Sequence, residues 1–212
     1  MIHQGSKETY DFIAQWCNTP FPFSKNDEWN RYALPSVLGH LFLLGLPDAH
    51  ILEIGVGESS LYLSELARRL KRTVYLCDVA PSKIDNPLTV DGYLLQSGYF
   101  FYGESDLFFK NVEFLPIGIA FIDGDHNYEQ VKKDFDNTWK ILVENGVIFL
   151  HDTYPPDEAM TSEHRCGTVY KLRQELEKRD DLDCFTFTKI AGVDVGITMV
   201  RKKPLNRPFY QA

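Results

Sequence analysis

The sequence alternates short apolar runs with stretches whose apolar residues follow a helical period, and this alternation most constrains the fold. We expect strands at residues 50–55, 73–78, 98–102, 117–123, 147–152, 184–188 and 196–201. We expect helices between them at residues 59–70, 105–110, 128–143 and 168–178. Strands and helices that alternate at this spacing form a parallel sheet with helices on both faces. The sequence therefore predicts an α/β fold of the doubly wound type.

Two details refine this expectation. The last two strands have only a short connection around residues 191–194, so they pair antiparallel and one strand of the seven is reversed near the C-terminus. Asn145-Gly146 is a typical end signal for the helix that begins at Tyr128.

Residues 1–47 lie outside the alternation. A helical pattern runs from Trp29 to Leu46, and Pro35 is expected to interrupt it. We expect two units: an N-terminal helical extension, residues 1–47, and an α/β domain, residues 48–212. The extension caps a ligand pocket or forms a homodimer contact, and the sequence leaves both possibilities open.

Composition limits the partners. The chain has 212 residues, with 22 Lys+Arg and 30 Asp+Glu, for a net charge of -8. This charge argues against a nucleic acid or an anionic membrane as the main partner. No run reaches the ~20 apolar residues of a membrane span. The four cysteines are far apart and the N-terminus lacks a secretory pattern, so we expect a cytoplasmic protein with reduced thiols.

A glycine-containing segment, Glu53 to Ser60, follows the first strand and opens a helix. Gly55 and Gly57 allow close approach of a ligand to the backbone, and the helix N-terminus attracts an anion. A dinucleotide-binding fingerprint has a third glycine where this chain has Ser60, which weakens a nicotinamide interpretation. The alternative is a tight strand-to-helix turn without a ligand.

Asp78 ends the second strand, 21 residues after Gly57. An acid near this spacing binds ribose hydroxyls in nucleotide-binding folds. A solvated carboxylate at a strand end is the alternative for Asp78 alone. Together with the glycine segment, Asp78 indicates a ligand that contains adenosine.

Acids and histidines follow the fourth and fifth strands. Carboxyl ends of parallel strands meet at one edge of a sheet, where ligands bind, so we expect these side chains to converge. They are Asp123, Asp125, His126, His151 and Asp152. For Asp125 or Asn127 the competing interpretation is an N-cap of the helix that begins at Tyr128. For the histidines it is a hydrogen-bonded loop residue.

These motifs carry a family resemblance. The succession LEIGVGESS, LCD, FFYGESDLFF, FIDGDHNYEQVKKDF, GVIFLHDTYPP and CGTVYKL resembles class I S-adenosylmethionine (SAM)-dependent methyltransferases. It is similar to the macrocin-type O-methyltransferases, over roughly residues 48–202. The resemblance implies a Rossmann-like fold and transfer of a methyl group from SAM to a small-molecule acceptor, at a hydroxyl oxygen.

The resemblance also implies roles for residues of the first two strands. Glu53 would lie near the methionine amino group. Gly55, Gly57 and the backbone of Ser59 would hold the methionine portion. Asp78 would bind the ribose hydroxyls.

The remaining implied cofactor contacts come from later strands. Glu104 and Ser105 would flank the adenine, and Asp123 would lie beside the sulfonium.

The same resemblance implies a magnesium ion and a base. Acids equivalent to Asp123 and Asp152 hold Mg²⁺ in the macrocin-type branch, and Asp125 matches the base. This chain departs from that pattern, because His151 stands where the branch has a second adjacent acid. Magnesium prefers oxygen ligands, so a metal-free site with His126 or His151 as the base is the alternative.

Two further points stay open. Residues 153–167 are predicted to be a loop without secondary structure that covers the acceptor, with His164 and Arg165 as contacts, or else a mobile surface loop. The function alternatives are a metal-dependent hydroxylase or hydrolase on the same scaffold and a non-catalytic SAM-binding module.

Overall fold

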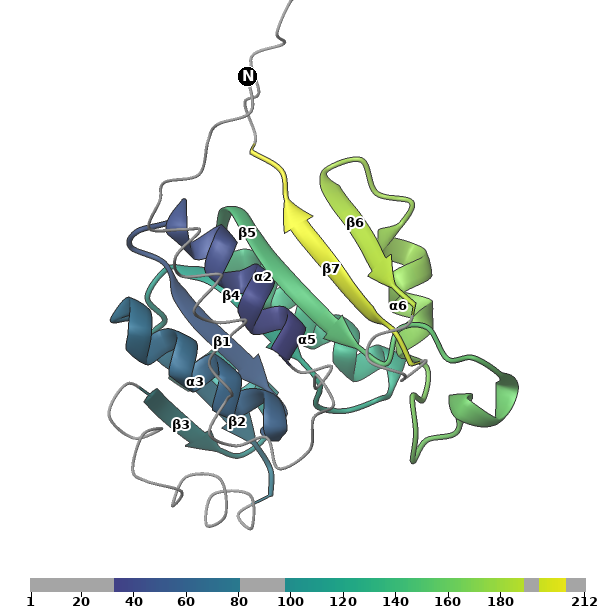
Figure 1. The fold of residues 1–212 in the computed structure, drawn as a ribbon. Helices are drawn as coiled ribbons and strands as arrows, with labels where there is room; N and C mark the ends of the chain where they lie inside the picture. Colours follow the sequence, from purple (N-terminus) through teal and green to yellow (C-terminus); the bar gives the residue numbers. More distant parts are fainter. Residues whose placement is uncertain (1–32, 81–97, 189–194, 205–212) are drawn as a thin grey trace, which may run out of the picture.

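The computed structural model describes residues 33–80, 98–188 and 195–204, which contain a seven-stranded sheet (Figure 1). The strand order is β3-β2-β1-β4-β5-β7-β6. The strands are β1 (His50–Ile54), β2 (Val74–Asp78), β3 (Gly98–Tyr102), β4 (Ile117–Ile122), β5 (Leu142–His151), β6 (Leu182–Phe187) and β7 (Ile197–Lys202).

Strands β1 to β5 pair in parallel, whereas β7 pairs antiparallel with both of its neighbours, β5 and β6. The single reversed strand is therefore β7. The predicted fold class is confirmed, including the position of the reversed strand near the C-terminus.

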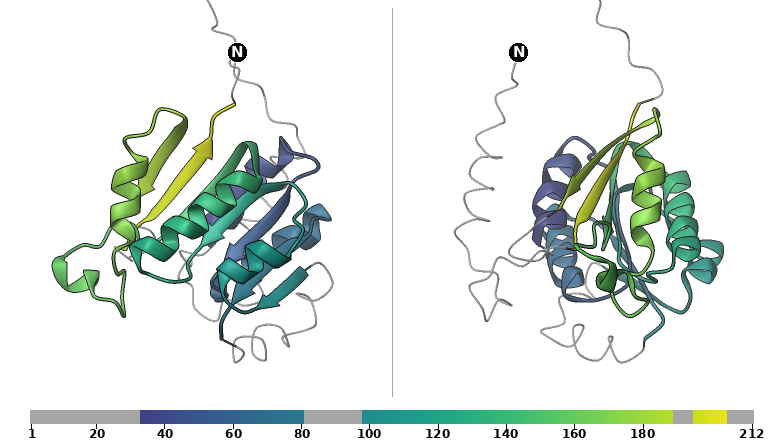
Figure 2. Two further views of the ribbon diagram at one scale, coloured as in Figure 1. Left: turned by 180° about the vertical axis from the view of Figure 1, so that it is seen from behind. Right: turned by 90° about the vertical axis from the view of Figure 1, so that its right-hand side faces the viewer.

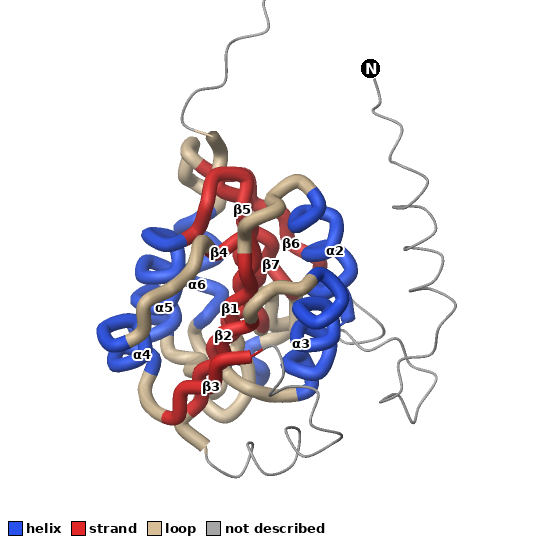
Figure 3. The backbone as a smooth tube through the Cα atoms, turned by 90° about the vertical axis from the view of Figure 1, so that its left-hand side faces the viewer, coloured by secondary structure: helices blue, strands red, loops and turns tan. Residues whose placement is uncertain are grey.

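Helices cover both faces of the sheet, as the edge-on view in Figure 3 shows. On one face α2 (Ala33–Leu44) contacts α3 (Glu58–Leu70). On the other face α5 (Tyr128–Ile141) lies between α4 (Ser105–Asn111) and α6 (Val169–Leu176), as Figure 2 shows from behind. Because helices cover both faces of the sheet, both faces of the central strands are buried. These strands are therefore almost wholly apolar.

Two apolar clusters fill the space between the sheet and its helices. On the α2–α3 face, Leu63 and Leu66 pack against β1 residue Ile51. On the opposite face, Phe108 of α4 is fully buried, and its ring lies 5.4 Å from that of Phe101 and 5.0 Å from that of Phe114. This packing holds the N-terminus of α4 beside the carboxyl ends of the strands.

One predicted boundary is wrong. Helix α5 ends at Ile141 and β5 begins at Leu142, so Asn145-Gly146 lies inside the strand and does not end the helix. The register between β4 and β5 shifts there, and Asn145 takes a positive φ of 64°. Asn and Gly tolerate the left-handed backbone of such an irregularity as well as they tolerate a helix end.

The predicted interruption at Pro35 is also wrong. Helix α2 runs through Pro35, which lies in its first turn, where the missing backbone N–H would have had no helical partner. Most of the proposed N-terminal extension, residues 1–32, lies outside the described residues, and its role stays a prediction. Among the residues that the structure describes, no helix has both the length and the apolar character needed to cross a membrane.

Residues 153–167 are not without secondary structure. They contain a short 3-10 helix, η3 (Glu158–Thr161), whose N-cap residue Asp157 accepts a hydrogen bond from the backbone N–H of Met160 at 3.0 Å. The proposed role of this segment over an acceptor stays a prediction.

Candidate functional site

The glycine segment after β1 contacts the acidic end of β2. The backbone N–H of Val56 donates to Oδ2 of Asp78 at 2.8 Å, and that of Gly55 donates to the carbonyl of Cys77 at 2.9 Å. Gly55 has a φ of +88°, and a Cβ there would lie 2.1 Å from the carbonyl oxygen of Asp123. Only glycine fits this turn, because both the conformation and the close approach exclude a side chain. The glycine segment and Asp78 therefore belong to one site.

Glu53 lies beneath this turn and is fully buried. The hydroxyl of Ser59 donates to Oε1 of Glu53. Oε2 is buried and has no hydrogen-bond partner among the described residues. Burial raises the pKa of Glu53 to about 8. A buried acceptor oxygen without a donor is costly, and it fits a bound group that brings an N–H donor.

A cavity of about 570 Å³ opens along the carboxyl ends of β1, β2, β3 and β4. Of the predicted cofactor-binding residues, the structure brings Gly55, Asp78, Glu104, Ser105 and Asp123 together on its wall. Its volume is in the range of pockets that hold small molecules. Several carboxyl groups line it, so a ligand with positive charge or N–H donors is favoured there.

The wall residues that sequence reasoning missed include Gln130 and Asp134 on α5. The Gln130 side-chain amide donates to Asp134 Oδ1 at 3.2 Å and to Ser105 Oγ at 3.1 Å, which ties α5 to the start of α4. Burial raises the pKa of Asp134 to about 6. The sequence contained a signal for these two residues. Polar residues recur at positions 130, 134 and 138, one helical turn apart, and each is followed by an apolar residue that faces the sheet.

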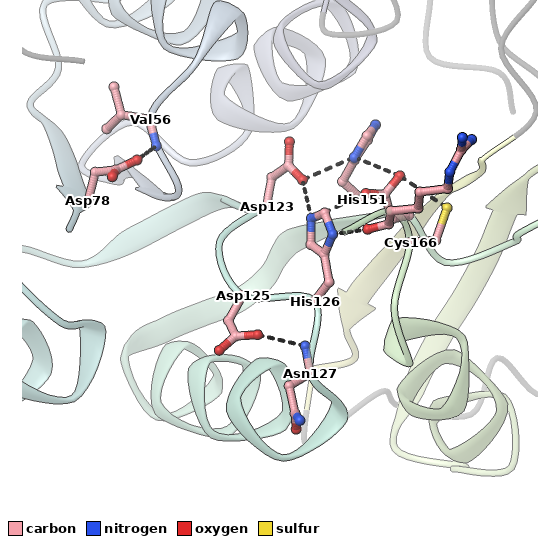
Figure 4. A network of polar contacts seen from close by, with 10 residues as sticks. Val56, Asp78, Asp123, Asp125, His126, Asn127, His151 and Cys166 are labelled. Carbon is pink, nitrogen blue, oxygen red and sulfur yellow. Dashed lines mark hydrogen bonds and ion pairs between the residues drawn. The ribbon is translucent and has the colours of Figure 1, made fainter. Parts of the chain in front are cut away.

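Four of the five predicted acids and histidines converge at the ends of β4 and β5 (Figure 4). His151 Nδ1 lies 3.0 Å from Asp123 Oδ1 and 3.2 Å from Asp152 Oδ1. His126 Nε2 lies 3.3 Å from Asp152 Oδ2 and 3.7 Å from Asp123 Oδ1. We call these four residues the imidazole–carboxylate cluster.

The backbone around the cluster holds its side chains in place. Asp152 has a φ of 56°, a left-handed conformation that Asp tolerates better than most residues. The thiol of Cys166 lies 3.7 Å from Asp152 Oδ1. Nδ1 of His126 contacts the carbonyl oxygen of Arg165, and the carbonyl of His126 accepts from Thr168 N–H at 2.8 Å.

The opposite charges of the cluster shift its pKa values. Burial opposes ionisation of Asp123, but hydrogen bonds to His126 and His151 outweigh it and lower the pKa of Asp123 to about 2. Burial likewise opposes protonation of His151, but contacts with Asp123 and Asp152 raise its pKa to about 9. The hydrogen bond to Asp123 raises the pKa of His126.

Asp125, the fifth predicted residue, lies apart from the cluster on the cavity wall. Its Oδ1 accepts from the backbone N–H of Asn127 at 2.7 Å. Asn127 is the N-cap of α5, since its side chain accepts from Glu129 N–H at 2.9 Å. The two loop residues His164 and Arg165 are exposed, and only the backbone carbonyl of Arg165 reaches the cluster.

The reversed strand β7 between β5 and β6, together with a cavity at the carboxyl ends of the parallel strands, defines the class I methyltransferase fold. Residues 52–153 match the model of a family described as "Methyltransferase domain". The matched range includes Glu53, Asp78 and the whole imidazole–carboxylate cluster. A comparison with curated proteins gives no match.

Solved structures share the fold at low identity. An O-methyltransferase from Bacillus cereus in complex with SAH is 16% identical with a TM-score of 0.65, over 95% of this chain and 94% of that one. The O-methyltransferase TomG from Streptomyces achromogenes, involved in tomaymycin synthesis and solved with SAM, is 18% identical with a TM-score of 0.63, over 94% and 92%. An rRNA methylase from Streptococcus thermophilus is 14% identical with a TM-score of 0.57, over 80% and 97%.

Proposed function

We propose that this protein transfers the methyl group of SAM to a hydroxyl oxygen of a small-molecule acceptor. One observation carries the proposal: the 570 Å³ cavity runs from Asp78 to Asp123, where it meets the imidazole–carboxylate cluster. A nucleoside-binding end and a polar reaction end thus share one space. Among the structural neighbours, TomG acts in the synthesis of a small molecule, which supports this acceptor class.

Residues of the cavity wall and of the adjoining β1 strand and turn each bind a different part of SAM. Asp78 binds the ribose hydroxyls through its carboxylate, which the Val56 and Ala80 N–H groups hold in position. Glu53 Oε2 accepts a hydrogen bond from the methionine ammonium, and Gly55 and Gly57 allow the methionine portion to approach the backbone. When bound, SAM supplies an electrophilic methyl group on a sulfonium.

Glu104 and Ser105 lie at the start of α4 and flank the adenine. Asp123 faces the sulfonium with its negative charge.

Asp125 is the general base that removes the proton from the acceptor hydroxyl. Asp125 lies two residues after Asp123 and lines the cavity. The backbone N–H of Asn127 donates to its carboxylate and orients it. In the reaction the acceptor oxygen bonds to the methyl carbon, the sulfur–methyl bond breaks, and the hydroxyl proton moves to Asp125. His126 and His151 were the other predicted bases, and their rings are held by Asp123 and Asp152.

Magnesium does not fit the cluster as it does in the macrocin-type pattern. Magnesium takes oxygen ligands in octahedral geometry, whereas here two imidazole nitrogens lie against the two carboxylates. We therefore derive no step through a magnesium ion.

Calorimetry tests the cofactor first. We expect SAM and S-adenosylhomocysteine to bind the folded protein, and absence of heat for both would favour the hydroxylase or hydrolase alternative. The second experiment measures S-adenosylhomocysteine formed with a panel of small hydroxylated acceptors and with ribosomal RNA. Turnover with RNA alone would refute the acceptor class, and SAM binding without any turnover would favour the non-catalytic module.

Two variants separate chemistry from binding. Asp125→Asn should retain SAM affinity and lose turnover, whereas Asp136→Asn on the part of α5 outside the cavity wall should retain both. The two alternatives for residues 1–47, a cap over the acceptor pocket or a homodimer contact, stay predictions, and sedimentation analysis of the full chain tests the homodimer.

A further inference from the structure

The wall of the cofactor cavity includes residues of two neighbouring helices, α4 and α5. Ser105 begins α4, and Gln130 and Asp134 lie on the first two turns of α5. Helix α4 also packs against β2, the strand that ends in Asp78. The α4–α5 part of the wall is therefore close to the strand whose acid faces the ribose in the proposed complex.

Asp134 is a buried acid in this part of the wall. Its side chain is only 1% exposed, although it lines the cavity. The two lysines that precede it on α5 point to other acids, because Lys133 contacts Asp106 and Lys132 contacts Glu175. Burial accordingly raises the pKa of Asp134 to about 6. A carboxyl group in such surroundings is stabilised by a ligand that brings an N–H donor.

Gln130 orients the carboxyl group of Asp134. The amide nitrogen of Gln130 donates to Oδ1 of Asp134 at 3.2 Å and to Oγ of Ser105 at 3.1 Å. Gln130 thus ties the acid on α5 to the first residue of α4. A carboxyl group can accept more than one hydrogen bond, so the bond from Gln130 fixes its direction without excluding a ligand.

The edge of an adenine base suits an acceptor of this kind. Adenine carries an amino group at position 6, and this group is an N–H donor. Hypoxanthine, the base of inosine, carries a carbonyl oxygen at the same position. A carboxyl oxygen accepts from the amino group but is repelled by the carbonyl oxygen. Binding sites discriminate strongly when the wrong ligand leaves a buried polar group unpaired.

We propose that Asp134 selects the 6-amino group of the adenine base, with Gln130 as its positioning residue. The inference rests on the proposed function, which places the base of SAM beside the start of α4. Glu104 and Ser105 flank the base there, whereas Asp134 decides which base is accepted. The selection comes from α5, a helix whose wall residues the sequence motifs did not indicate.

The first experiment compares two ligands that differ only at position 6 of the base. Calorimetry with the full chain measures binding of S-adenosylhomocysteine and of S-inosylhomocysteine. We expect S-adenosylhomocysteine to bind at least about tenfold more tightly, the lower end of what a hydrogen bond to a charged group contributes. Equal affinity, or tighter binding of S-inosylhomocysteine, would overturn the proposal.

The second experiment reverses the hydrogen-bonding character of the acid. In Asp134→Asn the side-chain oxygen can still accept from Gln130, and the new amide N–H faces the cavity. This donor suits a carbonyl at position 6 and not an amino group. The variant should bind S-adenosylhomocysteine more weakly and S-inosylhomocysteine more tightly, so that the affinity ratio falls at least about tenfold. A parallel loss for both ligands would mean that Asp134 has only a structural role.

Two further variants complete the series. Gln130→Met keeps the length of the side chain but removes the amide that orients Asp134, so the affinity ratio should fall, by less than in Asp134→Asn. Asp136→Asn makes the same chemical change on the part of α5 outside the cavity wall and should leave both affinities unchanged. Thermal unfolding shows which variants are folded. A ratio that Gln130→Met leaves unchanged would refute the positioning role, even if Asp134→Asn did not fold.

The two ligands also keep this inference separate from the proposed function. Binding of both ligands with equal affinity overturns only the role of Asp134 and leaves SAM as the cofactor. Absence of binding for both overturns SAM as the cofactor, and the selection of its base is refuted with it.

Discussion

The backbone N–H of Val56 donates to Oδ2 of Asp78 at 2.8 Å, and this bond joins the turn after β1 to the end of β2. Oδ1 of the same carboxylate accepts from Ala80 N–H at 2.7 Å. Asp78 therefore orients the loop around the cavity as well as facing the ligand. A nucleoside that binds Asp78 meets a carboxylate already fixed in position, so little side-chain entropy is lost on binding.

Replacement of Asp78 should weaken cofactor binding. Asp78→Asn retains one acceptor oxygen for Val56 N–H but loses the charge, and hydrogen bonds to a charged group contribute about 1.5–3 kcal/mol. We expect SAM affinity measured by calorimetry to fall about 10–100-fold. Asp136→Asn, on the part of α5 outside the cavity wall, is the control. Unchanged affinity in folded Asp78→Asn would show that the ribose assignment is wrong.

The two glycines of the turn should respond differently to alanine. Gly55→Ala places a Cβ 2.1 Å from the carbonyl oxygen of Asp123, at a residue with a φ of +88°. The substitution should lower the free energy of unfolding by about 1–3 kcal/mol and abolish SAM binding. A Cβ at Gly57 would meet no described atom within 4 Å, so Gly57→Ala should fold normally and weaken only SAM binding. Thermal unfolding and calorimetry measure the two effects. Equal destabilisation by both substitutions would contradict the structure.

Glu53 should make the ligand-free protein less stable as pH rises. Its pKa is about 8 in the folded state and 4.5 in the reference state, so between these values the unfolded chain loses a proton that the folded protein keeps. Folding stability therefore falls with pH in this window, by up to roughly 1.4 kcal/mol per pH unit. Glu53→Gln removes this component, so its stability relative to the wild type should increase from pH 5 to pH 8.

Urea denaturation at four pH values measures this difference. Glu113→Gln, at an exposed glutamate, is the control and should parallel the wild type. The same Glu53→Gln variant should bind SAM more weakly, because the charged acceptor for the ammonium is lost. A constant difference in stability across the pH range would refute a buried, protonated Glu53.

Phe108 should contribute strongly to the stability of the cofactor end of the cavity. It is fully buried, and Phe108→Ala should cost about 3–5 kcal/mol. Phe185 is 56% exposed and pairs with Phe187, so Phe185→Ala should cost less than about 1.5 kcal/mol. Chemical denaturation measures both. Similar costs for the two phenylalanines would argue against the packing of α4 on the sheet.

The sequence predicted the sheet well because local patterns carry that information. The buried central strands are short apolar runs between helical segments, and the short connection between the last two strands requires the reversed β7. The predicted helix end at Asn145-Gly146 was wrong because a helix end and a strand irregularity both use a residue with a left-handed backbone. Local propensity cannot distinguish the two, since tertiary pairing with β4 decides between them.

The sequence by itself also determined which chemical groups gather at the carboxyl ends of the strands, because parallel strands bring those ends to one edge. Only the tertiary structure decided how the groups are divided: His126 and His151 lie against Asp123 and Asp152, whereas Asp125 faces the cavity. The tertiary structure also decided that Gln130 and Asp134 are part of the cavity wall. The physical reason is that side-chain contacts depend on how α5 packs beside α4, and distances between separate segments are not encoded in local periodicity.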